Sequence, residues 1–161
     1  MRSWRMRFWR FVSIVLRKPR VVLDTNVLIS ASIAEQGYSA AILRAARQRR
    51  LLLLVSPYII QEYAAVMQRP HIIRKYQGIE GRVEALVRYL NAYAILVEPQ
   101  TIERVVLDDP KDDAILACAL AGQAHYVVSG DDHLQRLGAF RGIKILAPRD
   151  FATQVLHLSR S

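Results

Sequence analysis

The sequence has little cysteine and no long hydrophobic run, and each absence excludes a class of protein. Among 161 residues there is one cysteine, Cys118, so no disulfide can form within the chain. A zinc site with two or more cysteine ligands is excluded as well, unless two chains share it. No apolar segment approaches the length of about 18 residues that crosses a bilayer. We therefore expect a protein of a reduced, cytoplasmic compartment.

Acidic residues are missing from the first 20 positions, which carry seven basic side chains. The rest of the chain has 16 basic and 14 acidic residues, so most of the net charge of +9 belongs to this segment. On a helical projection its apolar residues share one side: Trp4, Phe8, Phe11, Val12 and Val15. We expect residues 1–19 to be a basic amphipathic extension. It could contact phosphates, lie on a membrane surface, pack on the body of the protein or simply extend from it.

Residues 20–161 have the length and the apolar content of one globular domain. Short apolar runs predict five strands, at 20–24, 51–55, 94–97, 125–129 and 143–146. Helical patterns separate them, at about 39–50, 57–69, 80–92, 111–122 and 148–158. Most of the strands lack polar–apolar alternation, which is typical of a parallel sheet that is covered on both faces. We therefore predict an α/β fold with roughly five parallel strands.

Three helix starts are marked by capping residues. Ser56-Pro57 and Asp109-Pro110 each place a capping side chain before a proline at the first helical position. After the first strand, Thr25-Asn26 begins another helix, with Asn26 as the expected N-cap.

Acidic residues gather where the predicted strands end. The first strand ends in Asp24, the fourth is followed by Asp131, and the helix after the third strand begins with Asp112 and Asp113. Glu62 lies about a turn and a half into the helix after the second strand. Ligands of open parallel sheets bind beyond the carboxyl ends of the strands, so these acids can meet at one edge. Taken singly, each aspartate could also be an ordinary helix cap or a favourable charge at a helix start.

Two of these acids are poorly explained as surface charges. The neighbours of Glu62 along its helix face are mostly apolar, and no basic residue stands beside it on that helix. Asp113 is followed on its face by Leu116, Ala117 and Leu120. Acids that face one another raise each other's pKa and destabilise the fold unless a cation joins them. Oxygen ligands without cysteine and without a histidine pair favour Mg²⁺ or Mn²⁺ over Zn²⁺.

Three segments, spread over about residues 20–150, match the pattern of a known family: VVLDTNVLISA, PYIIQEYAAVM and DDPKDDAILACALAGQAHYVVSGDDHL. Together they resemble the PIN domain family, in particular the toxins of bacterial toxin–antitoxin pairs (the VapC-like ribonucleases). The resemblance implies a three-layer α/β/α fold and a PIN-like nuclease domain over residues 20–161. It also implies a metal-dependent endoribonuclease that hydrolyses RNA phosphodiester bonds and is the toxin of such a pair. A homodimer and a small antitoxin partner are further implications.

The resemblance also assigns residues to the site. It assigns the catalytic and metal-binding acids to Asp24, Glu62, Asp113 and Asp131, and supporting polar roles to Ser129 and to Asn26 or Thr25. Many relatives carry an acid two residues after the last aspartate, where this chain has His133. His133 could bind a metal, contact a phosphate or only begin a helix.

RNA can approach an acidic pocket only if basic residues flank it. The candidates are Arg44, Arg47, Arg49, Arg50, Arg69, Arg74, Lys75, Lys111 and the N-terminal extension.

Two other classes of protein do not fit this chain at single residues. A phosphoacceptor receiver domain needs a lysine after its last strand, but Lys144 lies near the start of that strand. A phosphatase with an aspartyl nucleophile needs an acid two residues after Asp24, where Asn26 stands. The alternative from another class is a catalytically weak PIN-like protein that binds RNA or an antitoxin, and the histidine at position 133 is its best support.

Overall fold

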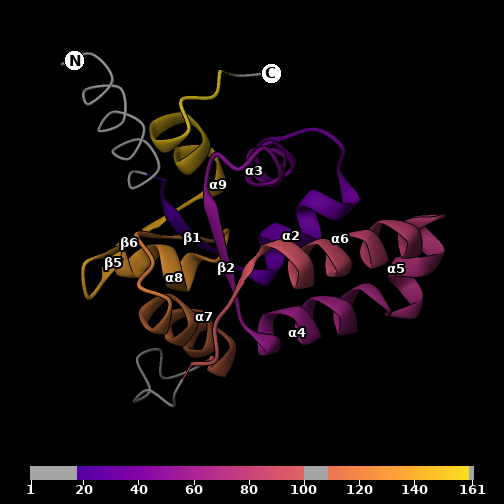
Figure 1. The fold of residues 1–161 in the computed structure, drawn as a ribbon. Helices are drawn as coiled ribbons and strands as arrows, with labels where there is room; N and C mark the ends of the chain where they lie inside the picture. The colour runs from indigo at the N-terminus through magenta and orange to yellow at the C-terminus, as the bar shows by residue number, and fades with distance from the viewer. Residues whose placement is uncertain (1–17, 100–108, 160–161) are drawn as a thin grey trace, which may run out of the picture.

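Six strands form one sheet in the computed structural model, which describes residues 18–99 and 109–159 (Figure 1). The strands are β1 (Arg20–Leu23), β2 (Leu52–Val55), β3 (Ile95–Leu96), β4 (Tyr126–Val128), β5 (Ala139–Phe140) and β6 (Ile143–Leu146). The helices are α2 (Thr25–Ile33), α3 (Tyr38–Arg47), α4 (Pro57–Met67), α5 (Pro70–Lys75), α6 (Ile79–Tyr93), α7 (Pro110–Ala121), α8 (Asp132–Leu137) and α9 (Pro148–Asp150), which continues into the π-helical turn η1 (Phe151–Val155).

The strand order is β3-β2-β1-β4-β6-β5, and all neighbouring pairs are parallel except β5 and β6. The predicted α/β class with a parallel sheet is therefore confirmed, and the five predicted strands are present. The additional strand β5 is only two residues long and forms a hairpin with β6. A strand of that length has no periodicity to detect, so no local pattern predicted it.

Helices flank the sheet. Helix α7 packs against β1, β2 and β4, while Figure 1 shows α3 and the α9–η1 segment on the other side of the strands. The central strands are covered completely: Val21, Val22, Val127 and Val128 have no exposed surface. This burial explains why the central strands read as continuous apolar runs rather than alternating ones.

Two of the predicted helix starts are confirmed. Ser56 accepts a hydrogen bond from the Ile59 N–H at 3.3 Å, and Asp109 accepts one from the Lys111 N–H at 2.9 Å. The third was wrong: α2 begins at Thr25, so Asp24 rather than Asn26 occupies the N-cap position. Asp24 makes no capping hydrogen bond with its side chain, because its carboxylate is directed to a different partner.

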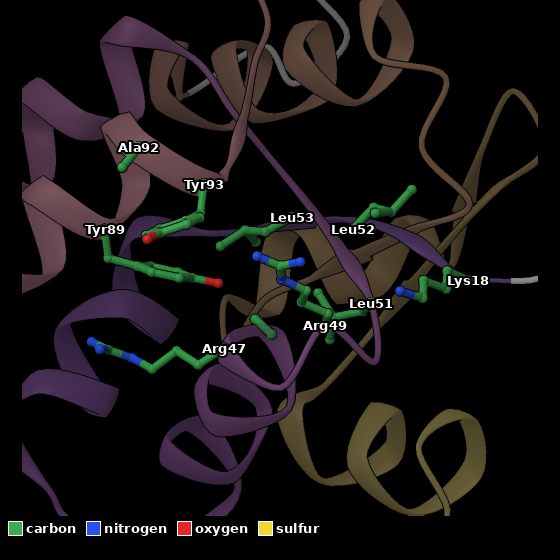
Figure 2. A pocket seen from close by; sticks show the side chains of 10 residues that line it. Lys18, Arg47, Arg49, Leu51, Leu52, Leu53, Tyr89, Ala92 and Tyr93 are labelled. Atoms are coloured by element: carbon green, nitrogen blue, oxygen red, sulfur yellow. The ribbon is translucent and has the colours of Figure 1, made fainter. Parts of the chain in front are cut away.

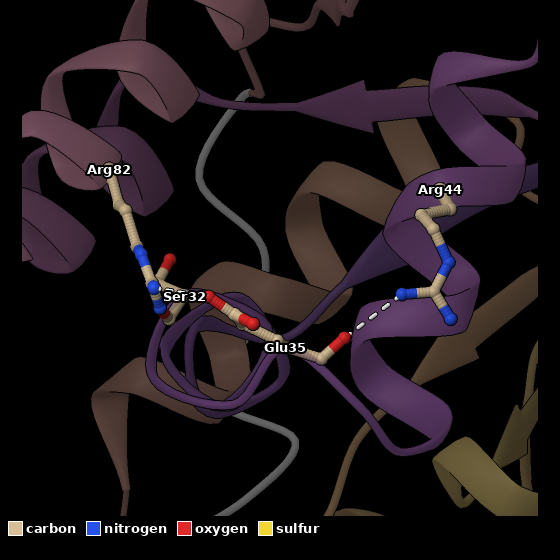
Figure 3. A network of polar contacts seen from close by, with 4 residues as sticks. All are labelled: Ser32, Glu35, Arg44 and Arg82. Carbon is tan, nitrogen blue, oxygen red and sulfur yellow. Dashed lines mark hydrogen bonds and ion pairs between the residues drawn. The ribbon is translucent and has the colours of Figure 1, made fainter.

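The connection between α2 and α3 is held by two arginines (Figure 3). Arg82 of α6 forms an ion pair with Glu35 and donates to the Ser32 carbonyl, while Arg44 donates to the Glu35 carbonyl at 3.0 Å. Arg44 is therefore engaged far from the ends of β1 and β4.

Other sequence expectations concern the two ends of the chain. The last helical segment ends at Val155 rather than near residue 158, and it passes from α9 into the wider π-helical turn η1. The amphipathic pattern predicted for residues 1–19 falls almost entirely outside the described residues. In the part of the chain that the structure describes, no helix is long and apolar enough to cross a membrane.

Candidate metal and nuclease site

The candidate site lies at the point in the sheet where the order in which strands are added changes sides. From β1 the chain moves through β2 to β3 on one side, then returns to place β4 on the other side of β1. Asp24 directly follows β1, and Ser129 directly follows β4. In open parallel sheets, such a switch point between neighbouring strands opens a crevice at the carboxyl ends. The fold thus brings together residues that are about a hundred positions apart.

Ser129 links the ends of the two strands through hydrogen bonds. Its hydroxyl donates to Asp24 Oδ2 at 2.6 Å and accepts from the Asp131 backbone N–H at 3.0 Å. Ser129 is completely buried, and its carbonyl accepts a hydrogen bond from the Gln135 side chain at 2.8 Å. This arrangement fixes the orientation of the Asp24 carboxylate and of the loop that carries Asp131.

Asn26 makes a second, weaker link across the same gap. Its side-chain Oδ1 accepts a hydrogen bond from the Gly130 N–H at 3.4 Å. The two supporting residues that the sequence predicted, Asn26 and Ser129, therefore both connect the region after β1 to the region after β4.

Asp24 is buried, and burial raises the pKa of its carboxyl above the usual value. The hydrogen bonds from Ser129 and from the Thr25 backbone oppose that rise, whereas the negative charges of Asp131 and Glu62 add to it. A carboxylate in these surroundings is stabilised by a bound cation, which reverses the balance of charges.

Three side chains offer ligand atoms that converge. One atom each from Asp112, Asp131 and His133 lie within 4.8 Å of one another. Asp112 is 3% exposed, and its Oδ2 is buried without a hydrogen-bond partner. Desolvation, followed by the charges of Asp131, Asp109 and Asp24, raises the pKa of Asp112 to about 6, while His133 opposes the rise. A buried carboxylate oxygen without a partner, on a residue that belongs to this converging group, fits a site for a divalent cation.

Asp112 was not among the residues that the sequence assigned to the site, whereas its neighbour Asp113 was. Asp113 is half-buried, and it is outside the converging group found among the described residues. In the sequence both acids are followed by apolar residues at positions three, four and seven, so no local pattern separates them. Burial does: the residues at those positions after Asp112 are Ile115, Leu116 and Ala119, and each is at most 1% exposed. The corresponding positions after Asp113 end in Leu120, which is partly exposed.

Glu62 lies beside this group on α4. The helix itself supplies no cation, but Lys111 of α7 does, with its Nζ 3.0 Å from Glu62 Oε1. Tyr58 is a further neighbour: burial and then the hydrogen bond and charge of Glu62 raise the pKa of its hydroxyl to about 12. Together with Arg69 these residues line a pocket of about 370 Å³. Glu62 is near enough to raise the pKa of Asp24, so it belongs to the same electrostatic environment.

The candidate RNA-binding cations are spread over the fold. Lys111 and Arg69 line the pocket beside Glu62. Arg47 and Arg49 line a different pocket, and Arg50 donates to the Leu156 carbonyl at 2.7 Å.

The donor set fits the predicted metals. Carboxylates from Asp24, Asp112 and Asp131 are the hard oxygen ligands that Mg²⁺ and Mn²⁺ prefer, and the imidazole of His133 is a ligand more suited to Mn²⁺. Buried Cys118 is not part of the group, and burial raises the pKa of its thiol to about 12.

Comparisons with known sequences agree with this architecture. A sequence profile of the PIN domain matches residues 20–133. An uncharacterised protein of Methanocaldococcus jannaschii is 30% identical over 117 residues, which cover 73% of this chain and 74% of that relative. PIN domains are typically metal-dependent nucleases. The profile match spans β1, β4 and every acid of the candidate site, and this chain belongs to the PIN domain family.

Proposed function

We propose that this protein is a metal-dependent endoribonuclease that hydrolyses RNA phosphodiester bonds. The observation that carries the proposal is the buried Asp112 Oδ2, which has no hydrogen-bond partner and lies in a group with Asp131 and His133. Leaving such an oxygen unpaired costs about 1–3 kcal/mol of stability, and a bound cation would remove that cost.

Asp24, Asp112, Asp131 and His133 would hold Mg²⁺ or Mn²⁺, and Glu62 and Asp113 are the further predicted acids. When bound, such a cation acts as a Lewis acid that lowers the pKa of water and neutralises phosphate charge.

The chain's own residues prepare the site. Ser129 holds one oxygen of Asp24, so that the other oxygen is presented to the crevice in a fixed direction. The backbone N–H of His133 donates to Asp131 Oδ1 at 2.7 Å, and this hydrogen bond fixes the orientation of that carboxylate in the same way. Glu62 is oriented by Lys111 and is placed to accept a proton from an attacking water. Hydrolysis by this arrangement needs no covalent intermediate with the protein.

RNA as the substrate, and the role of a toxin, rest on the resemblance to the VapC-like ribonucleases. With that role come a small antitoxin partner, a homodimer and a cytoplasmic location. Growth arrest when the wild-type protein is expressed, but not when the Asp24→Asn variant is, would support the toxin role. Sedimentation velocity at micromolar concentration tests the dimer.

Cleavage itself is tested with purified protein and a mixed set of structured and single-stranded RNAs, with single-stranded DNA alongside. Reactions contain Mn²⁺, Mg²⁺ or EDTA and either the wild-type protein, Asp24→Asn or the matched control Glu84→Gln, which removes an exposed acid on α6. We expect cleavage that requires metal and is lost only in Asp24→Asn.

The alternative, a catalytically weak protein that binds RNA or an antitoxin, gives a different result. It predicts no cleavage and no change in thermal stability between Mn²⁺ and EDTA. Unchanged cleavage in the Asp24→Asn variant would rule out the proposed site.

A further inference from the structure

A second pocket, of about 560 Å³, lies away from the acids (Figure 2). Its volume falls within the range typical of ligand sites. Three basic side chains, two tyrosines and a floor of leucines line it: Lys18, Arg47, Arg49, Tyr89, Tyr93, Leu51, Leu52 and Leu53. Among the ten described residues of its lining none is acidic.

The pocket lies at the opposite end of the strands from the candidate nuclease site. Lys18 stands just before β1 and Leu52 begins β2, whereas Asp24 follows the last residue of β1. Because β1 has four residues, at about 3.3 Å each, the end of the pocket at Lys18 is roughly 13 Å or more from Asp24. A molecule bound here therefore does not compete for the acids.

The tyrosines form a stacking surface that is open to solvent. The rings of Tyr89 and Tyr93 are 5.6 Å apart at a tilt of 31°, and Arg47 lies over the Tyr89 ring at 4.8 Å from its centre. Tyr93 is 68% exposed, so its ring is open to a stacking partner from solvent. Figure 2 shows the two rings on one side of the pocket, with Arg49 beside them and Lys18 towards the other end.

The basic residues of the pocket are available to a ligand. In the described ranges, 18–99 and 109–159, the ion pairs are Arg82–Glu35, Arg88–Glu84 and Lys111–Glu62, so no pocket cation is neutralised there. The guanidinium groups of Arg47 and Arg49 also oppose the rise in the pKa of Tyr89 that burial causes, which indicates that both charges are close to the ring.

Arg49 occupies a backbone position that normally carries glycine. Helix α3 ends in a Schellman motif: the Arg49 N–H donates to the Ala46 carbonyl at 2.9 Å, and the Arg50 N–H donates to the Ala45 carbonyl at 3.0 Å. Arg49 has a φ of 59°, the left-handed conformation for which glycine is preferred. Arg49 therefore holds this conformation at a cost to stability, and its side chain lines the pocket.

We propose that this pocket binds a segment of single-stranded RNA, with a base stacked on Tyr93 and the neighbouring phosphates held by Arg49 and Lys18. The inference rests on the proposed function, because the RNA would be the substrate held at a distance from the site of cleavage. Single-stranded nucleic acids bind exposed aromatic rings that lie beside unpaired cations. An acidic peptide would pair with the cations but would not stack on the rings.

The test measures binding without cleavage. The full chain carrying Asp24→Asn is titrated in EDTA against a fluorescent single-stranded RNA of 12 nucleotides, at several salt concentrations. Arg49→Gly removes the cation and relieves the backbone strain, so this variant should gain about 2–4 °C in Tm for each kcal/mol relieved. The matched control is Arg141→Gly, because Arg141 also has a positive φ, of 46°, but lies in the β5–β6 hairpin.

We expect Arg49→Gly to weaken RNA binding by about fivefold or more. The slope of log affinity against log salt concentration should fall by about one, which corresponds to one phosphate contact. Tyr93→Ala should weaken binding by about fivefold or more through lost stacking. Arg141→Gly should bind as the unmodified protein does, and a polyglutamate of equal charge should compete poorly.

The proposal is overturned if Arg49→Gly and Arg141→Gly weaken binding equally, if Tyr93→Ala binds normally, or if polyglutamate competes as well as RNA. Failure of the proposed function is seen separately, as absence of metal-dependent cleavage by the protein with Asp24 intact.

Discussion

Ser129 donates a 2.6 Å hydrogen bond to Asp24, and this bond joins two residues that are 105 positions apart in the chain. It is buried, and it links the carboxyl ends of the neighbouring strands β1 and β4. The same hydroxyl accepts the Asp131 N–H, so two acids of the site are oriented by one side chain. The site therefore depends on a residue that need not touch the metal or the substrate.

Ser129→Ala should weaken Mn²⁺ binding by about 10- to 100-fold, as measured by calorimetric titration. The variant leaves an oxygen of Asp24 and the N–H of Asp131 without their partner, which should also cost about 1–3 kcal/mol of stability. In the double variant that carries both Ser129→Ala and Asp24→Asn, the loss of stability should be smaller than the sum of the losses in the two single variants. Wild-type affinity for Mn²⁺ in Ser129→Ala would contradict this role.

Asp112→Asn should abolish the increase in Tm that Mn²⁺ produces, whereas Asp113→Asn should keep most of it. The reason is that Asp112 is buried beside Asp131 and His133, while Asp113 is half-buried and outside that group. Thermal melts of both variants with and without Mn²⁺ distinguish the two acids. The opposite outcome would restore the assignment that the sequence resemblance favoured.

The stability of the metal-free protein should fall as the pH rises from about 4 to about 7. The pKa of Asp112 is about 6 in the folded protein and 3.8 for an unperturbed carboxyl, so between these values the folded state holds the extra proton. Its contribution is fully present below pH 3.8 and is lost as the pH rises through 6. That difference corresponds to about 3 kcal/mol.

Urea denaturation in EDTA at pH 5 and pH 7.5 measures this effect. Asp112→Asn removes the titrating group, so its stability should change less between the two pH values than that of the wild-type protein. An equal change in both proteins would assign the pH dependence to other groups.

His133→Asp should shift the metal preference from Mn²⁺ towards Mg²⁺. Imidazole nitrogen suits transition metals, whereas a carboxylate suits Mg²⁺. Because His133 is exposed, the substitution should leave the fold intact. The ratio of the Mn²⁺ and Mg²⁺ dissociation constants is the measurement. An unchanged ratio would place His133 outside the coordination sphere.

Gly122→Ala should destabilise the fold by about 1–3 kcal/mol. A Cβ there would meet Leu54 Cδ1 at 2.9 Å, the Cys118 carbonyl at 3.1 Å and Val97 at 3.1 Å, where α7 crosses β2. Gly81→Ala in α6 is the matched control, because nothing lies within 4 Å of its Cβ. It should stabilise the protein by about 0.5–1 kcal/mol, through helix propensity. Denaturant titrations that rank the two variants the other way would contradict the packing described for α7.

Much of the fold could be predicted because its signals are local. The buried strands β1, β2 and β4 are continuous apolar runs, and the Ser-Pro and Asp-Pro pairs begin α4 and α7 as expected. Since parallel strands present their carboxyl ends at one edge, the positions of Asp24 and Asp131 near that edge also followed from the sequence. Strand β5 did not, because two residues are too few for a pattern.

Local patterns were therefore enough to predict the α/β class, most of the strands and helices in chain order, and the edge of the sheet at which acids gather. Tertiary structure decided which acid of the pair at 112 and 113 is buried in the site, because consecutive helical residues point about 100° apart and the packing of α7 on β1 and β4 sets the rotation. It also decided that Lys111 pairs with Glu62, and that Arg49 meets Tyr89 at the far end of the strands. These contacts join separate elements, and no local pattern predicts them because each depends on how two elements pack.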